Sequence, residues 1–158
     1  MADKLEQVAI RMVEQPPLYS KEPMNNPDAA IRVMNGFLSQ MDRELFCIVN
    51  LQADLTPINM NIVSVGSLNE ALINPREIFK SAILSNAHSM MLIHNHPSGN
   101  LTPSTSDIQT TARMQELGEL MGISLVDHII TGRNGNYYSF RAVSYTHLRA
   151  HETDSYLV

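Results

Sequence analysis

The predicted fold depends most on residues 90–107, which read MMLIHNHPSGNLTPSTSD. The apolar run over residues 90–93 is typical of a buried strand. Residues two apart on a strand point to the same side, so His94 and His96 can present two imidazoles to one point. Pro97 keeps His96 extended, because the residue before a proline disfavours helical geometry. The segment therefore predicts a strand that ends in a pair of histidines.

The residues after this strand predict a turn followed by a helix. Residues 98–100 are turn-forming, and Thr102-Pro103 suit an N-cap and a first helical position. Ser104 and Asp107 would then share one face of the first helical turn. Two histidine nitrogens and one carboxylate, with a fourth position free for water, are the ligands of a catalytic zinc site. Each pattern alone also suits a surface histidine pair or an ordinary helix start, but their combination favours the metal site.

The spacing of these residues resembles the signature of the JAMM (JAB/MPN-type) metallopeptidases, which is His-x-His, seven residues, Ser, two residues, Asp. The strings His-Asn-His-Pro-Ser-Gly and Pro-Ser-x-x-Asp resemble its RadC-type branch. The resemblance extends from about residue 27 to residue 141 and includes residues 65–68, 74–80, 127–132 and 139–140. It implies an α/β fold of the cytidine-deaminase-like JAMM/MPN type, in which a mixed β-sheet is flanked by helices.

Length and local composition predict how the chain is organised. Its 158 residues suffice for one domain with its own core. We predict an N-terminal segment over residues 1–26 and a JAMM/RadC-like domain over residues 27–142. Residues 143–158 depart from the family pattern and resemble a translated sequencing-library adapter, so we predict that this tail is not native. Its His147 and His151 are four apart, as on a metal-binding helix, but nothing around them supplies a third ligand.

Composition favours a cytoplasmic protein. No apolar run approaches the roughly 20 residues of a membrane helix, and the first residues do not resemble a secretory signal. The single cysteine, Cys47, lies in an apolar run and is predicted to be a buried structural thiol. The net charge is −5 without a basic stripe, which argues against direct nucleic-acid binding.

Apolar periodicity predicts the remaining elements. Residues 4–14 suit either a strand or a helix. Helix starts are predicted at Asn26-Pro27 and Asn74-Pro75, a strand hairpin over residues 45–49 and 58–65, and the end of a helix at Gly122. A second hairpin is predicted over residues 123–131 and 137–141 with its turn at 133–136. The buried face of the second helix is predicted to comprise Ile78, Phe79, Ala82 and Ile83. That of the third helix is predicted to comprise Met114, Leu117, Leu120 and Met121.

The resemblance also implies a general base. In JAMM enzymes this is a glutamate near the start of a core strand, and the matching residue is Glu44, directly before residues 45–49. Glu70, in a predicted loop, is an alternative. Glu77 is a weaker one, because it shares an exposed helix face with Arg76 and Lys80.

Three further residues receive predicted roles. Ser104 would donate its hydroxyl to a tetrahedral oxyanion, in addition to any hydrogen bond at the helix start. Asn95 lies between the two histidines and faces the other way, so we predict that it supports the backbone or a loop. His128, on a predicted strand, is either a structural residue or one that orients a metal ligand.

These observations favour a zinc-dependent metallopeptidase or isopeptidase that acts on a peptide or protein substrate through metal-activated water. The alternative is a non-catalytic DNA-repair or mobile-element accessory protein, which the resemblance to RadC suggests. A nucleobase deaminase is excluded, because its chemistry requires His-x-Glu and Pro-Cys-x-x-Cys. Residue 95 is asparagine here, and Cys47 is the only cysteine.

Overall fold

A computed structural model describes residues 7–9, 12, 20, 22–66 and 73–144. Most of the element predicted over residues 4–14 lies outside the described residues, as do Glu70, His147, His151 and nearly all of the tail predicted to be non-native. The elements are α1 Pro27–Leu38, β1 Leu45–Leu51, β2 Pro57–Val65, α2 Pro75–Leu84, β3 Ser89–Asn95, α3 Thr105–Met121, β4 Ser124–Thr131 and β5 Tyr137–Ser139. None of the helices in these ranges combines the length and apolar character that a membrane crossing requires.

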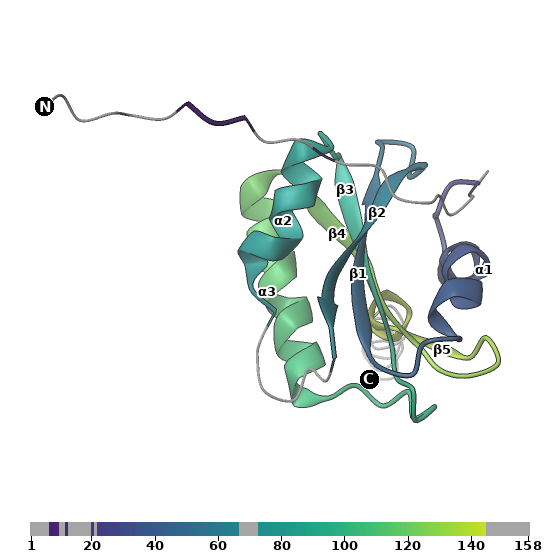
Figure 1. Ribbon diagram of the computed structural model, residues 1–158. Coiled ribbons are helices and arrows are strands. Elements are labelled where there is room, and N and C mark those ends of the chain that lie inside the picture. Colours follow the sequence, from purple (N-terminus) through teal and green to yellow (C-terminus); the bar gives the residue numbers. More distant parts are fainter. Residues whose placement is uncertain (1–6, 10–11, 13–19, 21, 67–72, 145–158) are drawn as a thin grey trace, which may run out of the picture.

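The strands form one mixed sheet in the order β2-β1-β3-β4-β5. β1 pairs antiparallel with both β2 and β3, β3 pairs parallel with β4, and β4 pairs antiparallel with β5. Helix α1 covers one face of the sheet, and α2 and α3 cover the other (Figure 1). The prediction of a mixed sheet flanked by helices is confirmed, and β3 lies in the middle of that sheet.

Side chains alternate between two cores along β3. Met91 and Ile93 pack in the core beneath α1, whereas Met90 and Leu92 pack in the core beneath α2 and α3. The same alternation directs His94 toward α3, where its ring stacks on Phe46 at 5.3 Å. Strand β3 therefore delivers its first histidine to the face that α3 covers.

Polar caps determine where the helices begin. Asn26 and Asn74 cap α1 and α2 as predicted, each followed by a proline in the first turn. Helix α3 begins at Thr105 with Ser104 as its N-cap, so the prediction of Thr102 as the cap is wrong. The reason is a reciprocal contact in which Ser104 Oγ accepts from the Asp107 N–H at 3.0 Å and Asp107 Oδ2 accepts from the Ser104 N–H at 2.8 Å.

The ends of several elements differ from prediction. β5 stops at Ser139, and residues 140–144 are helical instead of continuing the strand. Ile83, Leu120 and Met121 are exposed, although the predicted apolar faces included them. They lie in the last turns of their helices, and the buried residues of α2 and α3 end at Ala82 and Gly118.

Other local predictions are confirmed. Gly122 ends α3 with a φ of 70°, a left-handed conformation that favours glycine. Both predicted hairpins form, and the second turns through Asn134 and Gly135, which have positive φ. Cys47 is fully buried, and this burial raises the pKa of its thiol to about 12, as expected of a structural cysteine.

Candidate metal centre

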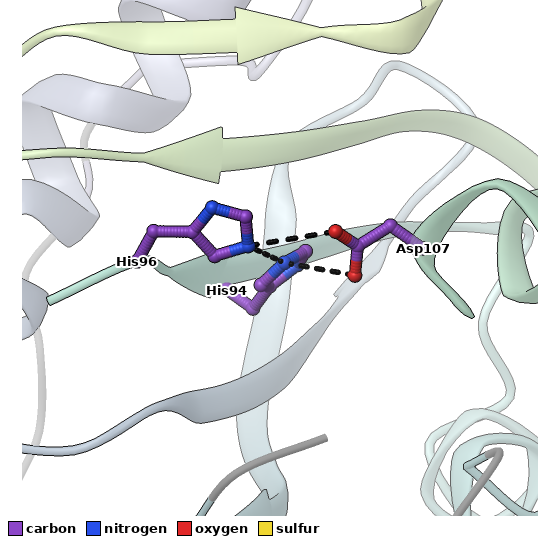
Figure 2. A group of neighbouring side chains, drawn as sticks. All are labelled: His94, His96 and Asp107. Atoms are coloured by element: carbon purple, nitrogen blue, oxygen red, sulfur yellow. Dashed lines mark hydrogen bonds and ion pairs between the residues drawn. The ribbon is translucent and has the colours of Figure 1, made fainter. Parts of the chain in front are cut away.

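Three potential metal ligands converge where β3 ends and α3 begins (Figure 2). Nε2 of His94 lies 3.1 Å from Nε2 of His96 and 3.2 Å from Oδ1 of Asp107. Nε2 of His96 lies 3.4 Å from Oδ2 of the same carboxylate. A tetrahedral zinc site with bonds of about 2.0–2.1 Å separates its ligand atoms by about 3.3–3.4 Å. The separations of His94 Nε2 from His96 Nε2 and from Asp107 Oδ1 are close to the edges of such a site, and one ligand atom from each of the three residues lies within 4.8 Å of the other two.

The burial of these groups also suits a cation. The side chains of His94 and Asp107 are 0% and 1% exposed, and that of His96 is 12% exposed. Oδ1 of Asp107 is buried and accepts no hydrogen bond, although His94 lies near it. Leaving a buried acceptor without a partner is costly. A metal ion between the three residues would satisfy this oxygen, so the residues present fit the group.

The hydrogen-bond partner of His96 fixes its tautomer. Nδ1 of His96 lies 2.7 Å from the backbone oxygen of Asn100. A carbonyl oxygen can only accept, so Nδ1 carries the hydrogen. The lone pair of Nε2 consequently faces Asp107, as metal coordination requires.

A chain of buried hydrogen bonds fixes the tautomer of His94 in the same way. The Thr111 hydroxyl donates to the backbone oxygen of Asp107 at 2.7 Å, and therefore accepts from Nδ1 of His128 at 2.6 Å. Nε2 of His128 then accepts from Nδ1 of His94 at 2.9 Å. Nε2 of His94 is left with its lone pair toward Asp107. The structure thus places His128 in contact with a potential ligand and supports the orienting role that was one of its two predicted roles.

Burial and neighbouring charges shift the pKa values at the site. Burial alone would raise the pKa of Asp107, but the imidazoles of His94 and His96 hold it well below its usual range. Without a metal ion, the Asp107 carboxylate accepts a hydrogen bond from the protonated His96 ring and so raises the pKa of His96, against the opposing effect of burial. Full burial lowers the pKa of His128 well below its ordinary value, so this ring is neutral.

The two residues predicted to act in catalysis lie close to this cluster. Glu44 directly precedes β1 and is half-buried, and its charge contributes to the raised pKa of His96. Ser104 caps α3 at the turn that also carries Asp107. Glu77 instead lies on the outside of α2, where Lys80 donates to it at 2.9 Å, as expected for a solvated residue.

Sequence reasoning missed Thr111. It lies four residues after Asp107, which places both on one face of α3, and this spacing could have indicated it. Its contact with His128 joins residues 17 apart and has no local signal.

Asp127, which precedes His128 on β4, has a structural role. Asp127 is buried and accepts hydrogen bonds from the Ser139 hydroxyl and the Arg141 N–H at 2.6 and 3.1 Å. It ties β4 to the end of β5. Burial raises its pKa, and these hydrogen bonds oppose that rise.

Comparisons with known proteins agree on one family. The family model described as RadC-like JAB domain matches residues 24–145. A UPF0758 protein of Desulfitobacterium hafniense is 40% identical over 124 residues, which cover 78% of this chain and 54% of that protein. UPF0758 proteins of Thermotoga maritima and Finegoldia magna are 44% identical over 101 residues and 40% identical over 111 residues. These alignments cover 64% and 70% of this chain and 45% and 50% of the relatives, so the chain spans about half the length of the curated relatives it matches.

Proposed function

The chain belongs to the RadC-like JAB domain family, and on this premise we propose that it is a zinc-dependent hydrolase of peptide or isopeptide bonds. One observation carries the proposal. Two imidazole lone pairs and a buried carboxylate oxygen without a hydrogen bond converge, with one ligand atom from each residue within 4.8 Å of the others, as a shared metal ion requires. Such a cluster is costly in a protein unless a cation occupies it.

His94, His96 and Asp107 would hold the metal ion. Two nitrogen ligands and one oxygen ligand, with a position left for water, favour zinc among the common divalent ions. When bound, the ion supplies Lewis-acid activation of water at neutral pH.

Glu44 is proposed as the general base. Its carboxylate would take a proton from the attacking water and return it to the leaving nitrogen of the cleaved bond. Its half-buried place beside His96 supports this role. Ser104 is proposed to stabilise the oxyanion. Its oxygen already accepts from the Asp107 N–H, which leaves the hydroxyl hydrogen free to donate.

The test compares the wild type with Glu44→Gln on a library of peptides and isopeptides, with zinc content measured by elemental analysis. We expect zinc in both proteins and a loss of kcat of about 10²–10⁴-fold in the variant, because general-base catalysis contributes that much. Glu77→Gln is the matched control, since Glu77 lies on the surface of α2, and it should cleave like the wild type.

Zinc binding without cleavage that depends on Glu44 would contradict the hydrolase proposal. It would instead favour the alternative predicted above, a non-catalytic accessory protein. Salt-dependent DNA binding by the purified protein would add to that alternative.

A further inference from the structure

Asn95 lies between the two histidines of the candidate metal centre and points away from it. It is 3% exposed, and its side chain makes two hydrogen bonds across the sheet. Its Oδ1 accepts from the Leu45 N–H at 2.7 Å, and its Nδ2 donates to the Arg43 oxygen at 3.0 Å. These two peptide groups flank Glu44, the proposed base, so a single amide holds the backbone on both sides of it.

We propose that Asn95 is a positioning residue that fixes Glu44 relative to the metal-binding strand. The part of this inference that concerns activity rests on the proposed function, whereas the part that concerns position does not. An amide is suited to the task because it carries one donor and one acceptor in a plane. An aspartate would lack the donor to Arg43, and an alanine would lack both groups.

The register of the sheet explains why a side chain is needed here. The last registered pair between β1 and β3 is Phe46 with His94, so Leu45 and Asn95 would form the next pair. At this pair the Leu45 N–H donates to the side-chain oxygen of Asn95 and not to a backbone carbonyl. On its other side β3 is paired with β4 up to Asn95 and Thr131, and this pairing continues one step further, where the His96 N–H donates to the Thr131 oxygen at 2.8 Å. The Asn95 side chain thus keeps the start of β1 attached to β3 at the point where the backbone pairing of the two strands ends.

Glu44 is held from its other side as well. Its backbone oxygen accepts from the Gly66 N–H at 2.8 Å, at the end of β2. The peptide groups around Glu44 are therefore fixed by β2 on one side and by Asn95 of β3 on the other. Removing the Asn95 amide would release one of these two attachments. A displacement of about 1 Å at a catalytic group can cost about 10²-fold in rate, so this attachment matters to the base.

The first test measures position without any substrate. Protein labelled with [¹³C]glutamate is loaded with Co²⁺, and the paramagnetic relaxation of the Glu44 side-chain carbons is recorded, with Glu44→Gln identifying the signal. We expect strong relaxation in the wild type and a several-fold decrease in Asn95→Ala. Amide hydrogen exchange at Leu45 should rise in the same variant, while Co²⁺ affinity stays at the wild-type value because none of the three ligands is changed.

Asn50→Ala is the matched control. Asn50 is a fully buried asparagine that donates to Asn59, and it lies near the end of β1 that is opposite Glu44. It should leave both the Glu44 relaxation and the Leu45 exchange unchanged. If Asn95→Ala fails to fold, Asn95→Asp decides, because it keeps the acceptor for Leu45 and replaces the donor to Arg43 by a carboxylate oxygen, which cannot donate. Wild-type relaxation of Glu44 in the folded Asn95 variant would overturn the proposal.

The second test uses the substrate found for the wild type. We expect Asn95→Ala to lower kcat by about 10²-fold with KM retained, because only the base is misplaced. In the Glu44→Gln background the same change should have no further effect, since the residue acts through Glu44. Multiplying losses in the double variant would overturn the proposal. If the wild type cleaves nothing, the proposed function fails, and the relaxation measurement still decides the position of Glu44.

Discussion

The orientation of the candidate metal ligands depends on single hydrogen bonds outside the cluster. A buried series of hydrogen bonds runs from Thr111 through His128 to His94. Each bond determines which nitrogen of the next ring carries the hydrogen. The series ends at the His94 nitrogen that faces Asp107. Partners of this kind raise metal affinity by fixing the tautomer and the ring orientation of a ligand.

Replacing Thr111 by valine tests this series. Valine keeps the shape of threonine and removes the hydroxyl. The Nδ1 hydrogen of His128 then has no acceptor, so the tautomer of this ring is no longer fixed. We expect zinc affinity to fall by about 10–100-fold and the free energy of unfolding to fall by about 1–3 kcal/mol. Competition with a chelator and urea denaturation would measure the two effects.

Thr110→Val is the control for this change. Thr110 is the preceding residue of α3 and is as buried as Thr111, at 5% exposure for both. It is not part of the hydrogen-bond series described here. Equal zinc affinities in the two valine variants would show that Thr111 does not act through His128.

At the scale of elements, the packing of α3 on β4 depends on a missing side chain. A Cβ on Gly118 would lie 2.6 Å from the backbone oxygen of Ile123 and 3.4 Å from the Leu125 nitrogen. Both neighbours are backbone and cannot rotate away. Glycine inside a helix lowers stability by about 1 kcal/mol relative to alanine. At position 118 the missing side chain permits the close approach of α3 to the start of β4.

Alanine substitutions at two helical glycines should therefore change the free energy of unfolding in opposite directions. Gly36 in α1 has no atom within 4 Å of its ideal Cβ position, so Gly36→Ala should raise the free energy of unfolding by about 0.5–1 kcal/mol. Gly118→Ala should lower it by about 1–3 kcal/mol, because overpacking outweighs the gain in helix propensity. Urea denaturation of both variants measures the difference, and a stabilised Gly118→Ala would refute the packing argument.

At the scale of the whole molecule, the cluster makes the stability of the metal-free protein depend on pH. The pKa of Asp107 lies below its ordinary 3.8, so its contribution is present above that pH and is lost as the pH falls. The pKa of His96 lies above its ordinary 6.5, so its contribution is present below 6.5 and is lost as the pH rises through the folded value. The combined contribution of these two groups to stability is therefore greatest between these limits.

Thermal unfolding in the presence of a chelator, followed from acid to alkaline pH, would check this expectation. Asp107→Asn should flatten both sides of the profile. Burial raises the pKa of Asp127, which has the opposite effect at the acid side, but Asp127 is present in both proteins and cancels in the comparison. Identical profiles for wild type and variant would mean that the pair does not control the pH dependence.

Much of the site could be predicted because its geometry is local. His94 and His96 lie two apart, and Asp107 lies in the first turn of the helix that follows, so the spacing indicated that they meet. The Asn-Pro helix starts and the asparagine-glycine turn were equally readable, because each depends on neighbouring residues. The family was identified from the same strings and is confirmed.

The rest depended on contacts between distant parts of the chain. Thr102 and Ser104 both suit an N-cap, and only the reciprocal contact with Asp107 decides between them. The apolar periodicity of α3 continued to Leu120, but periodicity does not show where the sheet stops covering a helix. The roles of Glu44 and Ser104 stay predictions, because position alone does not establish chemistry.

The three candidate ligands differ in how water reaches them. His94 on β3 and Asp107 on α3 are buried where the sheet and this helix meet. His96 lies past the end of β3 and remains partly in contact with solvent. Metal exchange would therefore proceed by rotation of the outer imidazole, with every strand staying in place. The rate at which the protein gains or releases an ion should accordingly follow the mobility of that one ring and not the rate of global unfolding.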